Sequence, residues 1–297
     1  MSHAPWLWAV FTVVAAASQT LRNATQRELT AKLGTAGATH VRFLFGLPFA
    51  VVFLALVWFG SGTALPQPGA AYWIWVLGGA LTQIAATALM LAAMNDRSFV
   101  VVYAYIKTEP VQVALFGLIL LGDRLTPLMT FAILLATCGV LIVGLRPGAA
   151  ASTGSTLLGL GAGAMFGLSA ICFRGAILNL NLPNYLMAAT FTMAAGLLAQ
   201  VALLSLYLWL RDPGTVRAIL RAWQPSMLAG FLGALASQFW FLAFALASAA
   251  SVRTLALIEV LFAQAISRFA FGQRTSTREA VGIVLIIIGV ALLVWAY

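Results

Sequence analysis

Two glutamates, Glu109 and Glu259, are the acidic residues of this 297-residue chain that fall inside apolar stretches of membrane-spanning length. The other five acids lie in or beside predicted connections: Glu28, Asp96, Asp123, Asp212 and Glu279. An ionised side chain at the bilayer centre costs on the order of 3 kcal/mol. We therefore expect Glu109 and Glu259 to be protonated, paired with a cation or exposed to a wet cavity, where each could exchange a proton.

Lys107 is the other strongly charged residue that we expect deep inside an apolar stretch. It lies two residues from Glu109, which on a helix turns it to nearly the opposite face, so the two are poor direct partners. Its long side chain could instead reach Glu259, or extend to an outer boundary of the membrane. Two interpretations stay open: a transport site, or a structural ion pair that locks helices together.

The further site candidates are polar or aromatic residues within the apolar stretches: Tyr103, Tyr105, Gln112, Gln83, Gln238, Trp240 and Arg42. Tyr105, Glu109 and Gln112 share one helix face and could line a cavity. Hydrogen bonds between helices are an equal alternative for Gln83 and Gln238. For Trp240 we favour a lipid-facing or core-packing role, and for Arg42 extension to the membrane surface. Pro110 removes a backbone donor next to Glu109 and can kink that helix.

The composition places all these residues in a membrane protein. Hydrophobic residues make up 63% of the chain and charged residues 8%, so a soluble domain could not cover its surface. About 20 apolar residues cross a bilayer as a helix. Ten such stretches predict an all-α integral membrane protein: residues 5–20, 37–59, 71–94, 99–121, 127–145, 157–173, 185–210, 225–247, 249–271 and 280–297.

The ten stretches form two related sets of five. A shift of 150 residues superposes Glu109 on Glu259 and Gly122 on Gly272, which predicts a first repeat over residues 1–150 and a second over 151–297. A repeat with an odd number of spans enters the membrane in the opposite orientation the second time. Inverted repeats around a midplane site are typical of secondary transporters that work by alternating access.

The basic residues predict the orientation in the membrane. Counted over alternate connections, Lys and Arg are concentrated on one side, which the positive-inside rule makes cytoplasmic. Both termini are then expected outside. The net charge of +9 is scattered over short connections, so we expect no nucleic-acid partner. Fourteen arginines against two lysines suggest, by association, a bacterial inner membrane.

Glycine spacing predicts one close helix contact. Gly159, Gly163 and Gly167 recur every four residues and form a smooth face in the sixth stretch. Such faces let helices approach closely, so we favour packing over substrate contact here.

A short motif adds a family resemblance. The run Leu-Gly-Asp-Arg-Leu-Thr at residues 121–126, echoed by Phe-Gly-Gln-Arg-Thr-Ser at 271–276, resembles the Leu-Gly-Glu-x-hydrophobic-Thr signature of EamA-type carriers of the drug/metabolite transporter superfamily. Asp123 and Gln273 stand where that signature has Glu. The resemblance implies ten spans in a five-plus-five repeat, and export of amino acids, other small metabolites or drugs.

The sequence therefore predicts a secondary exporter of small metabolites, with amino acids as the first candidates and protons as a candidate coupling ion. We expect membrane lipid as a partner, a monomer or homodimer, and no cofactor, bound metal or enzymatic activity, because no catalytic or metal-ligand cluster is recognisable. A membrane receptor or scaffold that does not transport, and an uptake or facilitated-diffusion carrier, are the alternatives.

Overall fold

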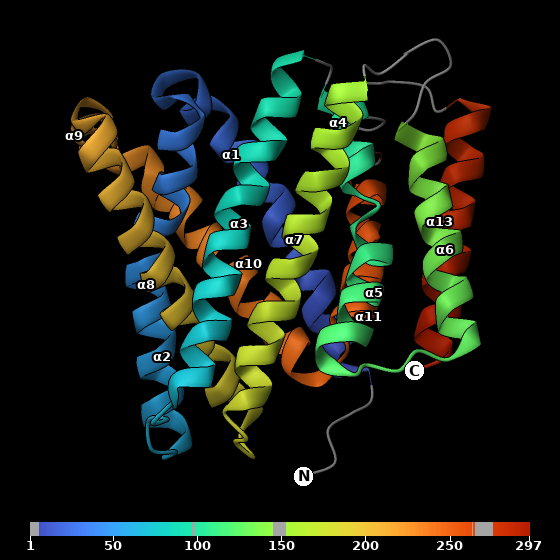
Figure 1. The fold of residues 1–297 in the computed structure, drawn as a ribbon, viewed down its shortest axis with the longest axis horizontal. Helices are drawn as coiled ribbons and strands as arrows, with labels where there is room; N and C mark the ends of the chain where they lie inside the picture. The colour runs from blue at the N-terminus through green and yellow to red at the C-terminus, as the bar shows by residue number, and fades with distance from the viewer. Residues whose placement is uncertain (1–5, 97–98, 145–152, 263, 265–275) are drawn as a thin grey trace. The chain divides into compact units, whose positions relative to one another are not determined.

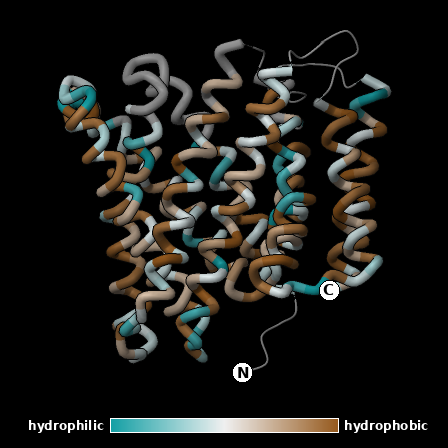
Figure 2. The backbone as a smooth tube through the Cα atoms, viewed as in Figure 1, coloured by the Kyte–Doolittle hydropathy of each residue, from teal (hydrophilic) through white to brown (hydrophobic). Residues whose placement is uncertain are grey.

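The computed structural model describes residues 6–96, 99–144, 153–262, 264 and 276–297, and it contains only helices over that part of the chain. The helices are α1 (Leu7–Leu44), α2 (Leu47–Ser61), α3 (Ala70–Asp96), α4 (Phe99–Ile106), α5 (Glu109–Leu121), α6 (Pro127–Gly144), α7 (Thr153–Asn179), α8 (Tyr185–Arg211), α9 (Pro213–Arg221), α10 (Trp223–Leu246), α11 (Ala249–Leu255), the 3-10 turn η1 (Ala256–Ile258) and α13 (Thr277–Trp295) (Figure 1). Most of their length is apolar, as Figure 2 shows for α6 and α13.

Eight of the helical segments are long and apolar enough to cross a membrane: 39–61, 70–90, 104–121, 127–144, 153–179, 185–211, 226–246 and 277–295. They correspond to eight of the ten predicted spans. The first predicted span falls within α1, and the ninth continues past α11 beyond the described residues. The membrane-spanning, all-helical class is thus confirmed, while the count of ten and the inverted repeat stay predictions.

The described chain divides into two compact units. The first unit comprises Met1–Val13, Thr82–Ile171 and Ala247–Tyr297, and the second comprises Val14–Leu81 and Cys172–Leu246. The predicted repeat boundary near residue 151 lies outside the described residues. Each unit draws on both halves of the sequence, so each is held together by contacts between residues far apart in the chain.

Helix α1 differs from the prediction. The segment between the first two predicted spans is helical, which agrees with its content of Ala, Gln, Arg, Glu and Leu. A methyl group added at Gly233 would lie 3.1 Å from Cγ of Arg42 and 3.5 Å from Cδ of Arg22. Twenty residues of straight helix would separate these two arginines by about 30 Å. Helix α1 therefore turns back on itself between them, as its ribbon does in Figure 1.

The first unit contains the close packing of α6 on α13. Atoms added as Cβ at Gly139 and Gly282 would each lie 2.6 Å from the other residue's carbonyl oxygen, and one at Gly289 would lie 2.7 Å from the amide of Ala136. Only residues without a side chain permit so close a backbone approach. Leu257 and Ile286 bury their side chains beside this contact, together with Ala136 and Val140.

Side-chain caps begin two helices in this unit. Thr126 accepts a hydrogen bond from the amide of Met129 at the start of α6, and Ser276 forms a capping box with Glu279 at the start of α13. Gly122, in the middle of the 121–126 motif, has a φ of +68° and ends α5 in the left-handed conformation that glycine adopts without strain. The motif thus supplies the turn between α5 and α6.

The second unit is built around α8, which packs against α2, α9 and α10. Asn184 caps α8 by accepting hydrogen bonds from the amides of Leu186 and Met187. Its own amide nitrogen donates to the hydroxyl of Thr63, just beyond α2, at 2.9 Å. One residue therefore fixes both the start of α8 and its position against the end of α2.

Candidate functional site

Glu109 lies where the fourth predicted span breaks in two. Helix α4 ends at Ile106, Lys107 and Thr108 form a turn, and α5 begins with Glu109. The kink predicted from Pro110 is present as an interruption of the helix. Pro110 fits the first turn of α5, where no backbone N–H is needed, but in an unbroken helix it would have no N–H to donate to the preceding turn. The hydroxyl of Thr108 donates to the carbonyl of Tyr105 at 2.7 Å. It thereby supplies a hydrogen-bond donor to a carbonyl near the end of α4.

Glu259 occupies the matching place in the second half of the chain. Helix α11 runs into the 3-10 turn η1, which ends at Ile258, and helical structure resumes at Glu259. Both acids thus begin a helical segment that follows an interruption.

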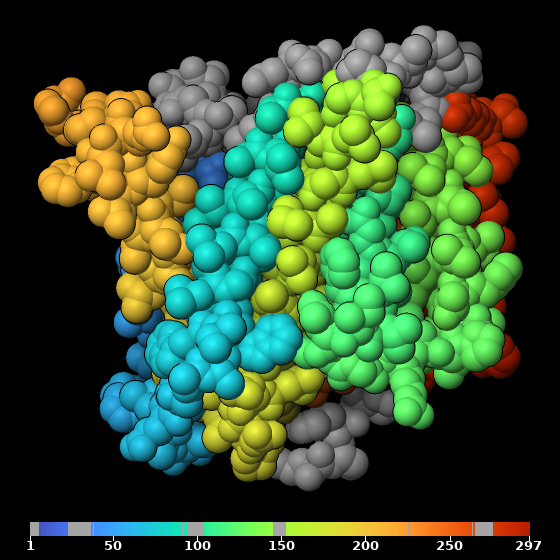
Figure 3. All heavy atoms as spheres, in the orientation of Figure 1, coloured from blue at the N-terminus to red at the C-terminus, as the bar shows by residue number. Residues whose placement is uncertain are grey.

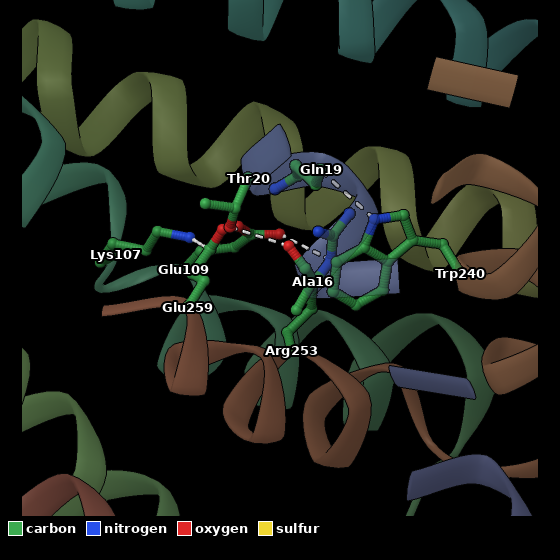
Figure 4. A network of polar contacts seen from close by, with 8 residues as sticks. All are labelled: Ala16, Gln19, Thr20, Lys107, Glu109, Trp240, Arg253 and Glu259. Atoms are coloured by element: carbon green, nitrogen blue, oxygen red, sulfur yellow. Dashed lines mark hydrogen bonds and ion pairs between the residues drawn. The ribbon is translucent and has the colours of Figure 1, made fainter. Parts of the chain in front are cut away.

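Each acid is paired with a cation from the other half of the sequence. Nε of Arg253 lies 3.0 Å from Oε1 of Glu109, and Lys107 forms an ion pair with Glu259 (Figure 4). The side chains of Glu109 and Glu259 are 9% and 5% exposed, those of Arg253 and Lys107 15% and 10%. We call these four residues the charged tetrad. With its acids ionised and its bases protonated, the tetrad has no net charge.

Of the partners considered for Lys107, the structure places Glu259 against it. The other cation was not identified from sequence. Ser248 caps α11 by accepting from the amide of Ser251, so Arg253 lies within the helix. A usable signal existed, because Arg253 falls inside the predicted span 249–271. The cations do not follow the repeat: a shift of 150 residues places Arg253 on Tyr103 and Lys107 on Leu257.

Helix α7 packs closely against the interruption between α4 and α5. Atoms added as Cβ at Gly159, Gly163 and Gly167 would lie 3.0 Å from Cβ of Tyr105, 3.0 Å from the carbonyl oxygen of Ile106 and 2.9 Å from Val113. The packing role predicted for this glycine face is confirmed. The same atom at Gly167 would lie 3.7 Å from Cγ of Glu109, so the smooth face of α7 also bounds the tetrad.

Gln112 and Tyr105 lie on either side of this interruption. Nε2 of Gln112 donates to the carbonyl of Leu160 on α7 at 3.4 Å, so this side chain links helices as well as sharing the face of Glu109. Tyr105 is half-buried against Gly159. Gln83 is half-buried on α3, where its carbonyl accepts from Thr87. The side chain of Tyr103 lies outside the described residues.

The remaining candidates belong to the second unit. Nε2 of Gln238 donates to the hydroxyl of Thr190 at 2.7 Å, a bond between α10 and α8. The indole of Trp240, 5% exposed, donates to Gln19 at 3.3 Å and stacks near Phe244. These contacts agree with the packing alternatives for both residues. The guanidinium of Arg42 lies 4.4 Å from the ring centre of Phe43, a cation–π contact.

Metal chemistry has no support in the described residues, which contain no group of three or more His, Cys, Asp and Glu that could hold an ion. The tetrad could instead exchange one member of an ion pair for a charged group of a ligand. Each buried charge has an opposite charge against it, and removing a single partner from a buried pair is costly. A ligand can replace such a partner only if it brings the same charge to the same place.

Comparison with known proteins agrees with this architecture. The sequence model of the EamA-like transporter family matches residues 6–145 and 154–295. A solved structure described only as "Crystal structure of protein" is similar in fold, with a TM-score of 0.70 and 17% sequence identity over 95% of this chain and 97% of that one. None of the curated proteins matches the chain.

Proposed function

Because the chain belongs to the EamA-like transporter family, and so to the drug/metabolite transporter superfamily, we propose that it exports small zwitterionic metabolites across the membrane, with α-amino acids as the first candidates. The observation that carries this proposal is the charged tetrad. Interrupted helices supply the substrate and ion sites of many secondary transporters, and Glu109 and Glu259 each follow a break in regular α-helix.

The neutrality of the tetrad supports a zwitterion as substrate. An ammonium group can take the place of Arg253 beside Glu109, while the substrate carboxylate takes the place of Glu109 beside Arg253. Every buried charge then keeps an opposite partner. A substrate with a single charge would leave one protein group unpaired, at a cost of several kcal/mol.

The connectivity of the tetrad supports alternating access. Both ion pairs join the first half of the sequence to the second within the first unit, so a rearrangement that separates α5 from α11 would open them. A proton on Glu259 would cancel its attraction to Lys107, and arginine keeps its proton throughout. We therefore assign proton coupling to the Lys107–Glu259 pair and substrate exchange to the Arg253–Glu109 pair.

Transport by the purified full-length protein in proteoliposomes tests this proposal. Glu109→Gln should abolish concentrative uptake of labelled amino acids into inside-out vesicles. Glu259→Gln should retain exchange between unlabelled and labelled substrate but lose its dependence on a proton gradient. Glu279→Gln removes an acid from the capping box of α13, where Gln can serve as well, and should transport normally. Wild-type rates for both site variants over the whole pH range would refute the assignment.

The same preparation separates the alternatives. The two ion pairs also suit a structural lock in a receptor or scaffold that does not transport. Single cysteines beside the tetrad should be labelled alternately from the two faces in a transporter, and from one fixed face in a scaffold. Counterflow without a gradient would identify a facilitated-diffusion carrier, and accumulation in right-side-out vesicles an uptake carrier.

We further propose the inner membrane of a bacterium as the location, with both termini on the outer side. The proposal rests on the distribution of basic residues between alternate connections. Tags placed at each terminus should be digested by protease added to intact spheroplasts. Protection of both tags would reverse the orientation.

A further inference from the structure

Helix α9 has an outer face that combines arginines with large apolar side chains. Its inner face, Val216 and Ile219, packs on the cluster that includes Val41, Leu208 and Ala229. Arg217, Leu220 and Arg221 are three and four residues apart and share the opposite side. All three are exposed, Leu220 to 57%.

The residues that flank α9 continue this surface. Arg211 is exposed at the end of α8, directly after Trp209 and Leu210, which are 66% and 67% exposed. Trp223, 53% exposed, follows α9. Figure 2 shows the alternation of polar and apolar residues along α9, and Figure 3 shows the orange side chains of this segment uncovered at the edge of the view.

The one acid within this segment does not neutralise the arginines. Both carboxylate oxygens of Asp212 are used at the start of α9, where they accept from the amide of Thr215 at 3.1 Å and from its hydroxyl at 2.6 Å. Within the described part of the chain Arg211, Arg217 and Arg221 form no ion pair. Three guanidinium groups therefore remain available to a partner outside the protein.

We propose that α9 and its flanks form a binding surface for anionic phospholipids. An amphipathic helix with Trp and Leu beside Arg lies in the plane of the membrane interface, with its apolar side chains among the acyl chains and its cations at the headgroups. Arg binds phosphate through two parallel hydrogen bonds, which suits it to this contact. None of these residues belongs to the charged tetrad.

Lipid titration of the delipidated full-length protein in detergent tests this inference. Phosphatidylglycerol should be retained in native mass spectra and should raise the Tm, and phosphatidylcholine should do so much less. Each arginine near the headgroups contributes about 1 kcal/mol, or about fivefold in affinity. Arg217→Gln with Arg221→Gln should therefore weaken phosphatidylglycerol binding by about 25-fold, and Arg217→Lys with Arg221→Lys should largely retain it.

The matched control is Arg124→Gln, which removes an exposed arginine in the connection between α5 and α6 and should leave lipid binding unchanged. Since Arg217 and Arg221 are exposed, the Tm without lipid should be the same for all variants. Unchanged phosphatidylglycerol affinity in the double Gln variant would overturn the proposal. Competition by glycerol 3-phosphate at equal concentration would also overturn it, because it would identify a site for a free phosphate.

Discussion

Arg253 lies six residues before Glu259 in the sequence, yet its guanidinium pairs with Glu109, whose Oε1 is 3.0 Å from Nε of the arginine. Removing the positive charge leaves Glu109 buried without a partner, at a cost of about 3–5 kcal/mol. Arg253→Gln should therefore lower the Tm strongly. Arg253→Lys should lower it less, because the charge stays while the planar donor geometry is lost.

A double variant separates the charge from other effects of the substitution. Arg253→Gln with Glu109→Gln removes both charges, so its Tm should lie above that of either single variant. Thermal unfolding in detergent gives the four values of the cycle. Additive losses would mean that the two side chains do not interact in solution.

Exchanging the two residues of the Lys107–Glu259 pair should destabilise the protein less than removing one of the two charges. Lys107→Met or Glu259→Gln alone leaves one buried charge uncompensated and should reduce the yield of folded protein. The exchange Lys107→Glu with Glu259→Lys keeps one charge of each sign and should restore part of that yield. Size-exclusion chromatography of the four proteins measures it. Equal yields for the single and exchanged variants would contradict the pairing.

Close packing of α6 on α13 predicts a sharp response to a single methyl group. Gly282→Ala would place Cβ 2.6 Å from the carbonyl of Gly139 and from Cγ2 of Val143. Overpacking of this kind costs about 1–3 kcal/mol. The Tm should fall, whereas Gly154→Ala, whose Cβ meets nothing within 4 Å, should leave it unchanged or raise it. Similar shifts for the two variants would rule out the close contact.

Asp212 predicts a pH dependence at the start of α9. Hydrogen bonds from the hydroxyl and amide of Thr215 lower the pKa of this exposed carboxyl below its ordinary 3.8. A depressed pKa in the folded state means that the stabilisation is complete above pH 3.8 and is lost as the pH falls through the lower value. The Tm difference between wild type and Asp212→Ala should be constant from pH 7 to 5 and shrink below 3.8. A difference that persists at pH 2 would contradict this cause.

The sequence predicted the elements that follow from local chemistry. Pro110 predicted a kink before α5 because it acts on backbone groups within one turn, and the caps at Thr126 and Ser276 are equally local. The interruption at Ala256–Ile258 contains no proline or glycine, so no local signal marked it. The structure is therefore what identifies this interruption.

The pairing of charges was harder to predict because it depends on which helices meet. The repeat places Glu109 and Glu259 in equivalent positions, but nothing in the spacing of residues connects Arg253 to Glu109. Helix α5 packs on α11, and this tertiary contact brings them together. The reversal within α1, by contrast, agrees with the two separate spans predicted at 5–20 and 37–59, because Arg22 and Arg42 both lie beside Gly233.

The crossed partners have a consequence for biosynthesis. Glu109 enters the translocon while Arg253, more than a hundred residues downstream, has not yet been synthesised, which at ribosomal speed is a delay of about ten seconds. During that interval Glu109 lacks the cation that pairs with it in the folded protein, and an unpaired charge in lipid is costly. An isolated amino-terminal half should therefore fold less well than the same half coexpressed with the carboxyl-terminal half as a separate polypeptide.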